Sequence, residues 1–145
     1  MRPLAWRDDE GNALVEFTVL ALLLLVPLVY VLLGAFQVQR AAFGVTEAAR
    51  QAGRAFARAE SVEVGTARAQ AASRLALADQ GIADAPDPVV ECPEGVCLAP
   101  GSTVRVTVSY TVRLPVLSLL APGGVGVPVT ATHVAVVDTF QDGAA

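Results

Sequence analysis

The chain has 145 residues, a formal net charge of −4, and a hydrophobic content of 54%. Its 10 basic residues are all arginines scattered along the chain, so there is little electrostatic basis for nucleic-acid binding. The length suits one small domain, and the hydrophobic excess points to a membrane segment.

The first predicted element is an apolar run from Phe17 to Phe36 that contains no charged side chain. At a rise of about 1.5 Å per residue it is long enough to cross a bilayer core of roughly 30 Å. Glu16 stands directly before it, five positions after Gly11. An ionisable residue at the margin of a spanning helix usually marks a functional site or a partner, because an unpaired charge in lipid is costly. The alternative is that Glu16 lies in the headgroup layer.

This order of residues resembles a type IV prepilin signal, and specifically the TadE-like family of tight-adherence (Flp pilus) minor pilins. The resemblance depends on Gly11, the Glu16-Phe17 pair and the helix behind them, roughly the first third of the chain. It implies that a prepilin peptidase cuts between Gly11 and Asn12 on the cytoplasmic side of the membrane. It also implies that Glu16 pairs with the new terminal amine of a neighbouring subunit. The acidic residues directly before Gly11 depart from the basic flank that the family leads one to expect.

The expected fold class is α+β, with a long N-terminal transmembrane helix followed by a small antiparallel β-sheet, as in pilins. We expect a leader at 1–11, a transmembrane helix at 12–36, an extracytoplasmic helical extension at 37–80 and a small β-sheet region at 81–145. Arginines occur on both sides of the span, so the positive-inside rule does not decide the orientation. The resemblance favours an N-terminus inside and a C-terminal region outside the cytoplasmic membrane.

The segment from Gln37 to Gln80 lacks proline and is rich in good helix formers, which predicts that the helix continues. Glycines in it predict an interruption near 61–66, with Thr66 capping a second segment. The predicted apolar face comprises Phe43, Ala49, Ala52, Phe56 and Ala57, and the predicted basic face comprises Arg50, Arg54 and Arg58.

Small residues also recur along this segment, at Ala41, Gly44, Ala48, Ala49, Ala52 and Gly53. Such residues allow a close approach of another helix, as in a filament core or a membrane dimer. They would equally allow packing against the sheet of the same chain, and both interpretations stay open at this point.

The proline-rich stretch 81–100 predicts a surface connection that carries Cys92 and Cys97. An extracytoplasmic region lies in an oxidising compartment, and Pro93 and Gly95 favour a turn, so we expect a small disulfide loop. A metal site and a redox pair are the alternatives. Two cysteines without a nearby histidine give too few ligands for zinc, and their spacing is not that of a thioredoxin-like motif.

Beyond the loop the hydrophobic period changes from helical to two, which predicts strands. Valines from Val104 to Val112 alternate with polar residues, and a second strand is expected from about Val127 to Phe140. The segment Val89–Glu91 would add a short edge strand. The apolar connection 114–126 is long for a tight turn and would contact the membrane surface, a partner or the edge of the core.

The sequence contains no recognisable catalytic constellation. His133 is the single histidine and has no serine, cysteine or carboxylate at a triad spacing, and the glycine run at 123–126 lacks the lysine of a phosphate-binding loop. The acidic residues at 84–94 lack the order of a calcium loop. We therefore expect no enzyme, no metal and no cofactor.

The resemblance implies a minor pilin or pseudopilin that takes part in assembling a tight-adherence pilus, with a role in cell adhesion or in a related (type II) secretion machinery. The implied partners are the prepilin peptidase, major and minor pilins, and the inner-membrane assembly platform. One alternative is an uncleaved single-pass membrane scaffold or partner-binding protein. Another is a secreted domain cut near Leu33–Ala35, although the apolar run exceeds the usual signal-peptide core.

Overall fold

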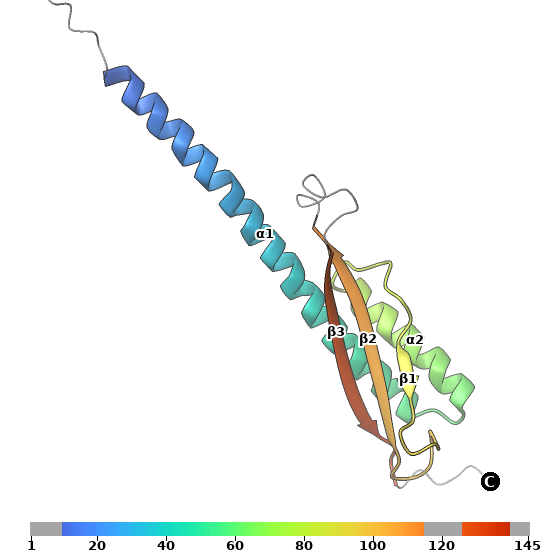
Figure 1. Cartoon of the computed structure of the whole chain (residues 1–145). Helices are drawn as coiled ribbons and strands as arrows, with labels where there is room; N and C mark the ends of the chain where they lie inside the picture. The colour runs from blue at the N-terminus through green and yellow to red at the C-terminus, as the bar shows by residue number, and fades with distance from the viewer. Residues whose placement is uncertain (1–9, 115–125, 140–145) are drawn as a thin grey trace, which may run out of the picture. The chain divides into compact units, whose positions relative to one another are not determined.

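The structure is a computed structural model that describes residues 10–114 and 126–139, with side chains from residue 13 onward. It has the predicted α+β arrangement, a long apolar N-terminal helix followed by a small antiparallel sheet (Figure 1). The elements are α1 (Glu10–Ala57), α2 (Val62–Ala78), β1 (Val89–Glu91), β2 (Thr103–Arg113) and β3 (Gly126–Val136). Most of the predicted leader and of the connection 114–126 lies outside the described residues.

By its internal contacts the chain forms two units, Met1–Ala35 and Phe36–Ala145. In the first unit, α1 begins at Glu10, whereas the leader was predicted to stay outside the helix through Gly11. No proline separates Gly11 from the apolar run, so the helix extends through this glycine at a cost of about 1 kcal/mol. Pro27 lies inside α1, where it cannot donate a hydrogen bond to the preceding turn.

In the second unit, the predicted continuation of the helix is confirmed, because α1 runs without a break to Ala57. Its buried face comprises Ala41, Val45, Ala48, Ala49, Ala52, Phe56 and Ala57. The prediction for Phe43 was wrong, since its side chain is 72% exposed. Phe43 follows Ala41 by two residues, which is about 200° around the helix and places it on the opposite side.

The small residues of α1 pack within the chain. Ala48, Ala49 and Ala52 belong to two core clusters that also contain residues of α2, β2 and the end of the sheet. At Gly53 a methyl group would come within 3.1 Å of Cδ2 of His133, so this glycine lets α1 approach β3 closely. Of the two open interpretations, packing against the sheet of the same chain is the one that the described residues show.

The helical interruption lies at residues 58–61, slightly before the predicted 61–66. The N-cap of α2 is Ser61, whose Oγ accepts a hydrogen bond from the backbone N–H of Val64 at 3.3 Å. Thr66 was predicted to be the cap but lies inside α2, where its hydroxyl donates to the carbonyl of Val62. Ser61 takes the role because its extended backbone turns its side chain toward the free N–H groups of the first turn.

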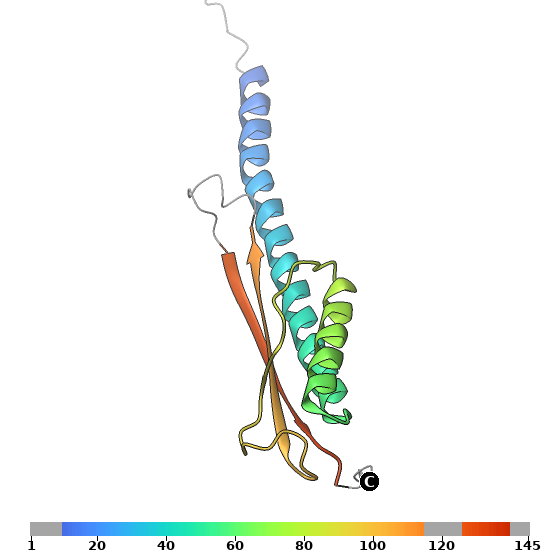
Figure 2. The same ribbon diagram turned by 90° about the vertical axis from the view of Figure 1, so that its right-hand side faces the viewer.

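Helix α2 runs antiparallel to the end of α1. At one end Gly65 lies against Phe56, and at the other Nη2 of Arg40 donates to the carbonyl of Gln80 at 3.1 Å. Both helices cover the same face of the sheet (Figure 2). The buried residues of the two core clusters come from these helices and from that face.

The sheet has the antiparallel order β1-β2-β3, with Val106 of β2 opposite Val90 of β1 and His133 of β3. The alternation predicted for β2 is confirmed, because Val104, Val106 and Val108 are 0% exposed. The other face is polar, and Thr107 and Thr132 are joined there by a hydrogen bond of 3.0 Å between their hydroxyls. The edge strand predicted at Val89–Glu91 is also confirmed. Strand β3 ends at Val136 instead of continuing to residue 140.

Candidate functional site

The predicted assembly residues Glu16 and Phe17 lie in the first unit, on a part of α1 whose side chains are exposed. Phe17 is 73% exposed, and every side chain from Ala13 to Leu33 is exposed. Among the described residues this is the one helix long and apolar enough to cross a membrane, with a mean hydropathy of 2.8 over its most apolar part. The described residues do not cover these apolar side chains, which would be more stable in an apolar surrounding than in water.

Glu16 is the single charged residue between Ala13 and Gln39. It forms no ion pair or hydrogen bond with any residue that the structure describes. By contrast, the Thr18 hydroxyl is satisfied within the helix, because its Oγ1 donates to the carbonyl of Leu14 at 2.8 Å. A carboxylate in an apolar surrounding needs a cation or hydrogen-bond donors, and no described residue supplies either to Glu16.

The predicted processing residues Gly11 and Asn12 lie in the first turn of α1. The first N–H groups of a helix have no partner within it, and helix ends fray. The bond between Gly11 and Asn12 therefore lies at an end of α1, where helices fray. Asn12 is one helical turn before Glu16, so a new terminal amine would start close to the carboxylate along the same helix.

The predicted disulfide joins Cys92 to Cys97, with an S–S distance of 2.04 Å. A turn lies inside the loop, where the N–H of Gly95 donates to the carbonyl of Cys92 at 3.0 Å and Gly95 has a φ of 77°. Only glycine adopts such a φ without strain. Oε1 of Glu94 accepts a hydrogen bond of 2.9 Å from the Thr103 hydroxyl, which fastens the loop to the start of β2.

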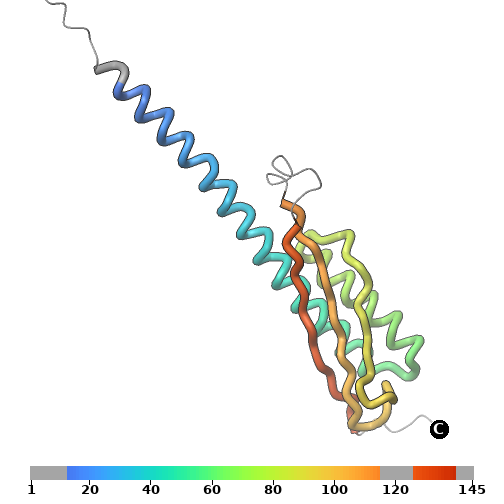
Figure 3. Tube along the Cα trace, viewed as in Figure 1, coloured from blue at the N-terminus to red at the C-terminus, as the bar shows by residue number. Residues whose placement is uncertain are grey.

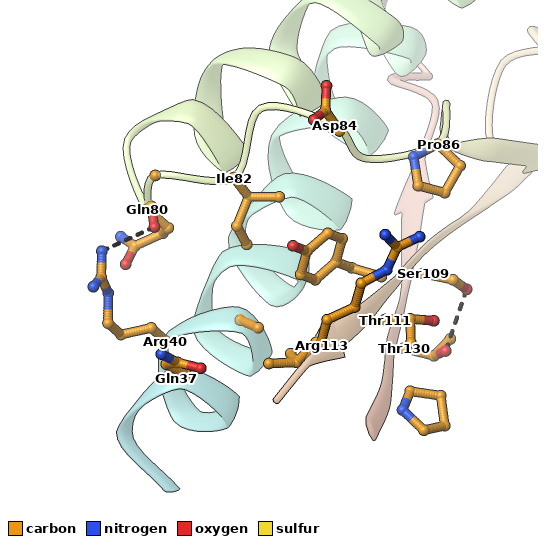
Figure 4. Close-up of a pocket in the computed structure, with 15 residues that line it drawn as sticks. Gln37, Arg40, Gln80, Ile82, Asp84, Pro86, Ser109, Thr111, Arg113 and Thr130 are labelled. Carbon is orange, nitrogen blue, oxygen red and sulfur yellow. Dashed lines mark hydrogen bonds between the residues drawn. The ribbon is translucent and has the colours of Figure 1, made fainter. Parts of the chain in front are cut away.

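The second unit also carries a hollow of about 750 Å³ that sequence reasoning did not find (Figure 4). It opens beside the start of β1, where Val89 lies opposite Thr107. From residue 108 to residue 113, β2 has no described strand on that side. Its charged lining residues are Arg40, Asp84 and Arg113, which come from α1, the α2–β1 connection and β2. Because the hollow depends on the short length of β1, no local sequence pattern reveals it.

A second hollow, of about 550 Å³, lies between α1 and the end of β3. Arg54 and Arg58 line it from α1, and residues 133–139 line it from the strand. The predicted basic face of α1 thus contributes two of its three arginines to this hollow. None of Glu16, Phe17, Cys92 and Cys97 lines either hollow.

Comparison with known protein families, curated proteins and solved structures finds no match to this chain. A function is therefore inferred from its own residues. The feature that carries the most chemical information is the Glu16 carboxylate on an exposed apolar helix, which has no partner among the described residues.

Proposed function

We propose that this chain is a TadE-like minor pilin or pseudopilin that takes part in assembling a tight-adherence pilus or a related secretion machinery. The observation that carries the proposal is Glu16, the single charged residue in the exposed apolar stretch of α1. A plain membrane anchor has no need for a carboxylate there, since the charge makes insertion less favourable by a few kcal/mol on translocon scales. A carboxylate kept for a partner offsets this cost when the subunits assemble.

The partner in this proposal is the terminal amine that a prepilin peptidase creates when it cuts between Gly11 and Asn12. An ammonium and a carboxylate attract each other strongly in an apolar surrounding, whereas either charge alone carries an uncompensated desolvation cost. The pair forms between neighbouring subunits and sets their register. The apolar residues that follow Glu16 pack against major and minor pilins at the inner-membrane assembly platform.

The proposed orientation places the N-terminus inside the cell and the second unit outside. The Cys92–Cys97 disulfide supports this orientation, because disulfides persist in extracytoplasmic compartments and are rare in the cytoplasm. The proposal leaves the second unit available for contacts with other subunits of the pilus.

The deciding measurement is the N-terminal residue and intact mass of the chain recovered from the membranes of its own cells. A start at Asn12 is expected. An intact Met1 would instead identify an uncleaved membrane scaffold, and a start near Phe36 a secreted domain. A Gly11→Val variant, which adds a branched side chain at the cleavage position, is expected to keep the full-length mass.

The role of Glu16 is tested by Glu16→Gln, which keeps the size of the side chain and removes its charge. We expect membrane insertion to persist and the yield of sheared pili to fall at least tenfold, since a loss of about 1.4 kcal/mol per contact already corresponds to a factor of ten. Glu47→Gln is the matched control, because Glu47 is an exposed carboxylate of the same helix whose Oε1 accepts a hydrogen bond from Gln51. A normal pilus yield from Glu16→Gln would refute the proposed role.

A further inference from the structure

Strand β3 forms one edge of the sheet, on the side of β2 away from β1 (Figure 3), and no strand among the described residues pairs with its outer side. Val137 directs its backbone toward β2, because its N–H donates to Ser102 at 2.9 Å and its carbonyl accepts from Gly101 at 3.1 Å. In an antiparallel strand this direction alternates from residue to residue. The even-numbered residues of β3 therefore direct their N–H and C=O groups outward, and no strand among the described residues pairs with them.

Proline closes one end of this open edge. Pro128 has an even number, so its nitrogen lies on the outer side and has no hydrogen to donate, a common device that protects an edge strand. From Thr130 to Val136 no such device occurs. The open part of the edge therefore comprises the backbone groups of Thr130, Thr132, Val134 and Val136.

The hollow of about 550 Å³ borders the second half of this open part, at Val134 and Val136, and is basic on its helical side. Arg54 and Arg58 are exposed and line it, together with residues 133–139, which include His133 and Asp138. Both guanidinium groups belong to exposed residues, and Arg74–Asp87 is the one ion pair that joins two described residues. An open row of backbone donors and acceptors thus lies beside two exposed guanidinium groups.

We propose that this edge binds an extended acidic segment of another protein, which adds a fourth strand to the sheet and directs its carboxylates toward Arg54 and Arg58. The main-chain bonds of such strand addition supply affinity, and the side chains supply specificity. The two arginines are four residues apart, about 6 Å along the helix, and side chains two residues apart on a strand are about 6.8 Å apart. The preferred partner therefore has acidic residues at every second position. This inference does not depend on the proposed function.

The added strand pairs antiparallel with β3 in this proposal, which continues the antiparallel order of the sheet, and this orientation fixes which partner amides are used. Residues opposite each other in an antiparallel pair place their side chains on the same face of the sheet. The outward-directed residues of β3, such as Thr132 and Val134, have their side chains on the exposed face. The partner residues that are hydrogen-bonded to them therefore also have their side chains on the solvent face. The partner's acidic residues face α1 instead, so their amides point away from β3.

The experiment uses the full chain in detergent micelles and a capped peptide of about seven residues with alternating threonine and glutamate. Amide hydrogen exchange is followed residue by residue. We expect the peptide to slow exchange at Thr130, Thr132, Val134 and Val136, with no comparable change at their odd-numbered neighbours. N-methylation of the threonine amides should abolish the effect, and N-methylation of the glutamate amides should leave it intact.

Charge is tested in the same assay. The double variant Arg54→Glu, Arg58→Glu should bind the peptide at least tenfold more weakly, as expected from two exposed ion pairs. The control is Arg50→Glu, because Arg50 is an exposed arginine of the same helix that does not line the hollow. Equal binding of a peptide with lysine in place of glutamate would overturn the proposal. So would protection of the same amides that rises with protein concentration in the absence of peptide, because a second copy would then occupy the edge.

Discussion

At the scale of single residues, the side chains of Ser61 and Glu63 stabilise the start of α2. Ser61 caps the helix through Val64, and the pKa of the Glu63 carboxyl is lowered, first by a hydrogen bond from its own backbone N–H and then by the Ser61 hydroxyl. A carboxylate in the first turn also interacts favourably with the partial positive charge at the helix N-terminus. These contacts favour the ionised form of Glu63 in the folded state.

A lowered pKa predicts a pH dependence of stability with a definite sign. The contribution of Glu63 is fully present above its ordinary pKa of 4.5 and is lost as the pH falls through the lowered folded-state value. Glu63→Gln should therefore lower the melting temperature at neutral pH, and the difference from the natural chain should vanish near pH 3. Melting curves in micelles at both pH values test this. A difference that grows on acidification would contradict it.

At the scale of elements, the contact between α2 and the end of α1 depends on a glycine. A methyl group at Gly65 would lie 3.0 Å from Cδ2 of Phe56 and 3.2 Å from Cβ of Ala59. Phe56 is 1% exposed, so its ring has little room to move. Glycine is thus kept inside a helix, where alanine is ordinarily favoured by about 1 kcal/mol, because the neighbouring ring occupies the space.

Gly65→Ala is accordingly expected to lower the free energy of unfolding by about 1–2 kcal/mol, since overpacking outweighs the gain in helix propensity. Gly44→Ala is the matched control. Its nearest neighbour outside α1 would be Cγ of Gln80 at 3.3 Å, on a flexible side chain that can move away. That variant should be as stable as the natural chain or slightly more so. Chemical denaturation of both variants measures the contrast, and equal losses would contradict it.

The sequence predicted the strands better than the helix faces. In β2, valines alternate with polar residues, so period two identifies both the strand and its buried side. In α1, alanines occur on the exposed side, as at Ala42, as well as on the buried side, so hydrophobicity alone ranked Phe43 as buried although it lies on the exposed side. The cap was misplaced for a related reason, since Ser61 and Thr66 both suit an N-cap and the backbone of residue 61 decided between them.

At the scale of the whole molecule, the buried core lies within the second unit. The first buried core residue is Ala41, and the two core clusters draw on α1, α2, β2, the end of β3 and Ile82. Of the candidate sites, Glu16 lies in the first unit and both hollows lie in the second. Glu16 was identified from sequence because an apolar run makes a lone charge conspicuous. The hollows depend on where β1 begins and where β3 ends, and they have no signature in local sequence.

A chain restricted to residues 37–145 should therefore fold without the apolar stretch. We expect it to remain in solution, to form the Cys92–Cys97 disulfide and to melt in one cooperative transition, because every buried core residue among those described is retained. Thermal melting followed by circular dichroism, with a mass measurement for the disulfide, tests this. A gradual, non-cooperative melt would mean that the apolar stretch contributes to the core.

The alanine-rich face of α1 reduces the side-chain conformational entropy that is lost on folding. Burying a long side chain costs up to about 2 kcal/mol of rotamer freedom, whereas alanine has none to lose. Ala41, Ala48, Ala49 and Ala52 therefore bring α1 against its neighbours at almost no loss of side-chain entropy. Each alanine buries little apolar area, but this small gain is matched by the low entropic cost of burying the side chain.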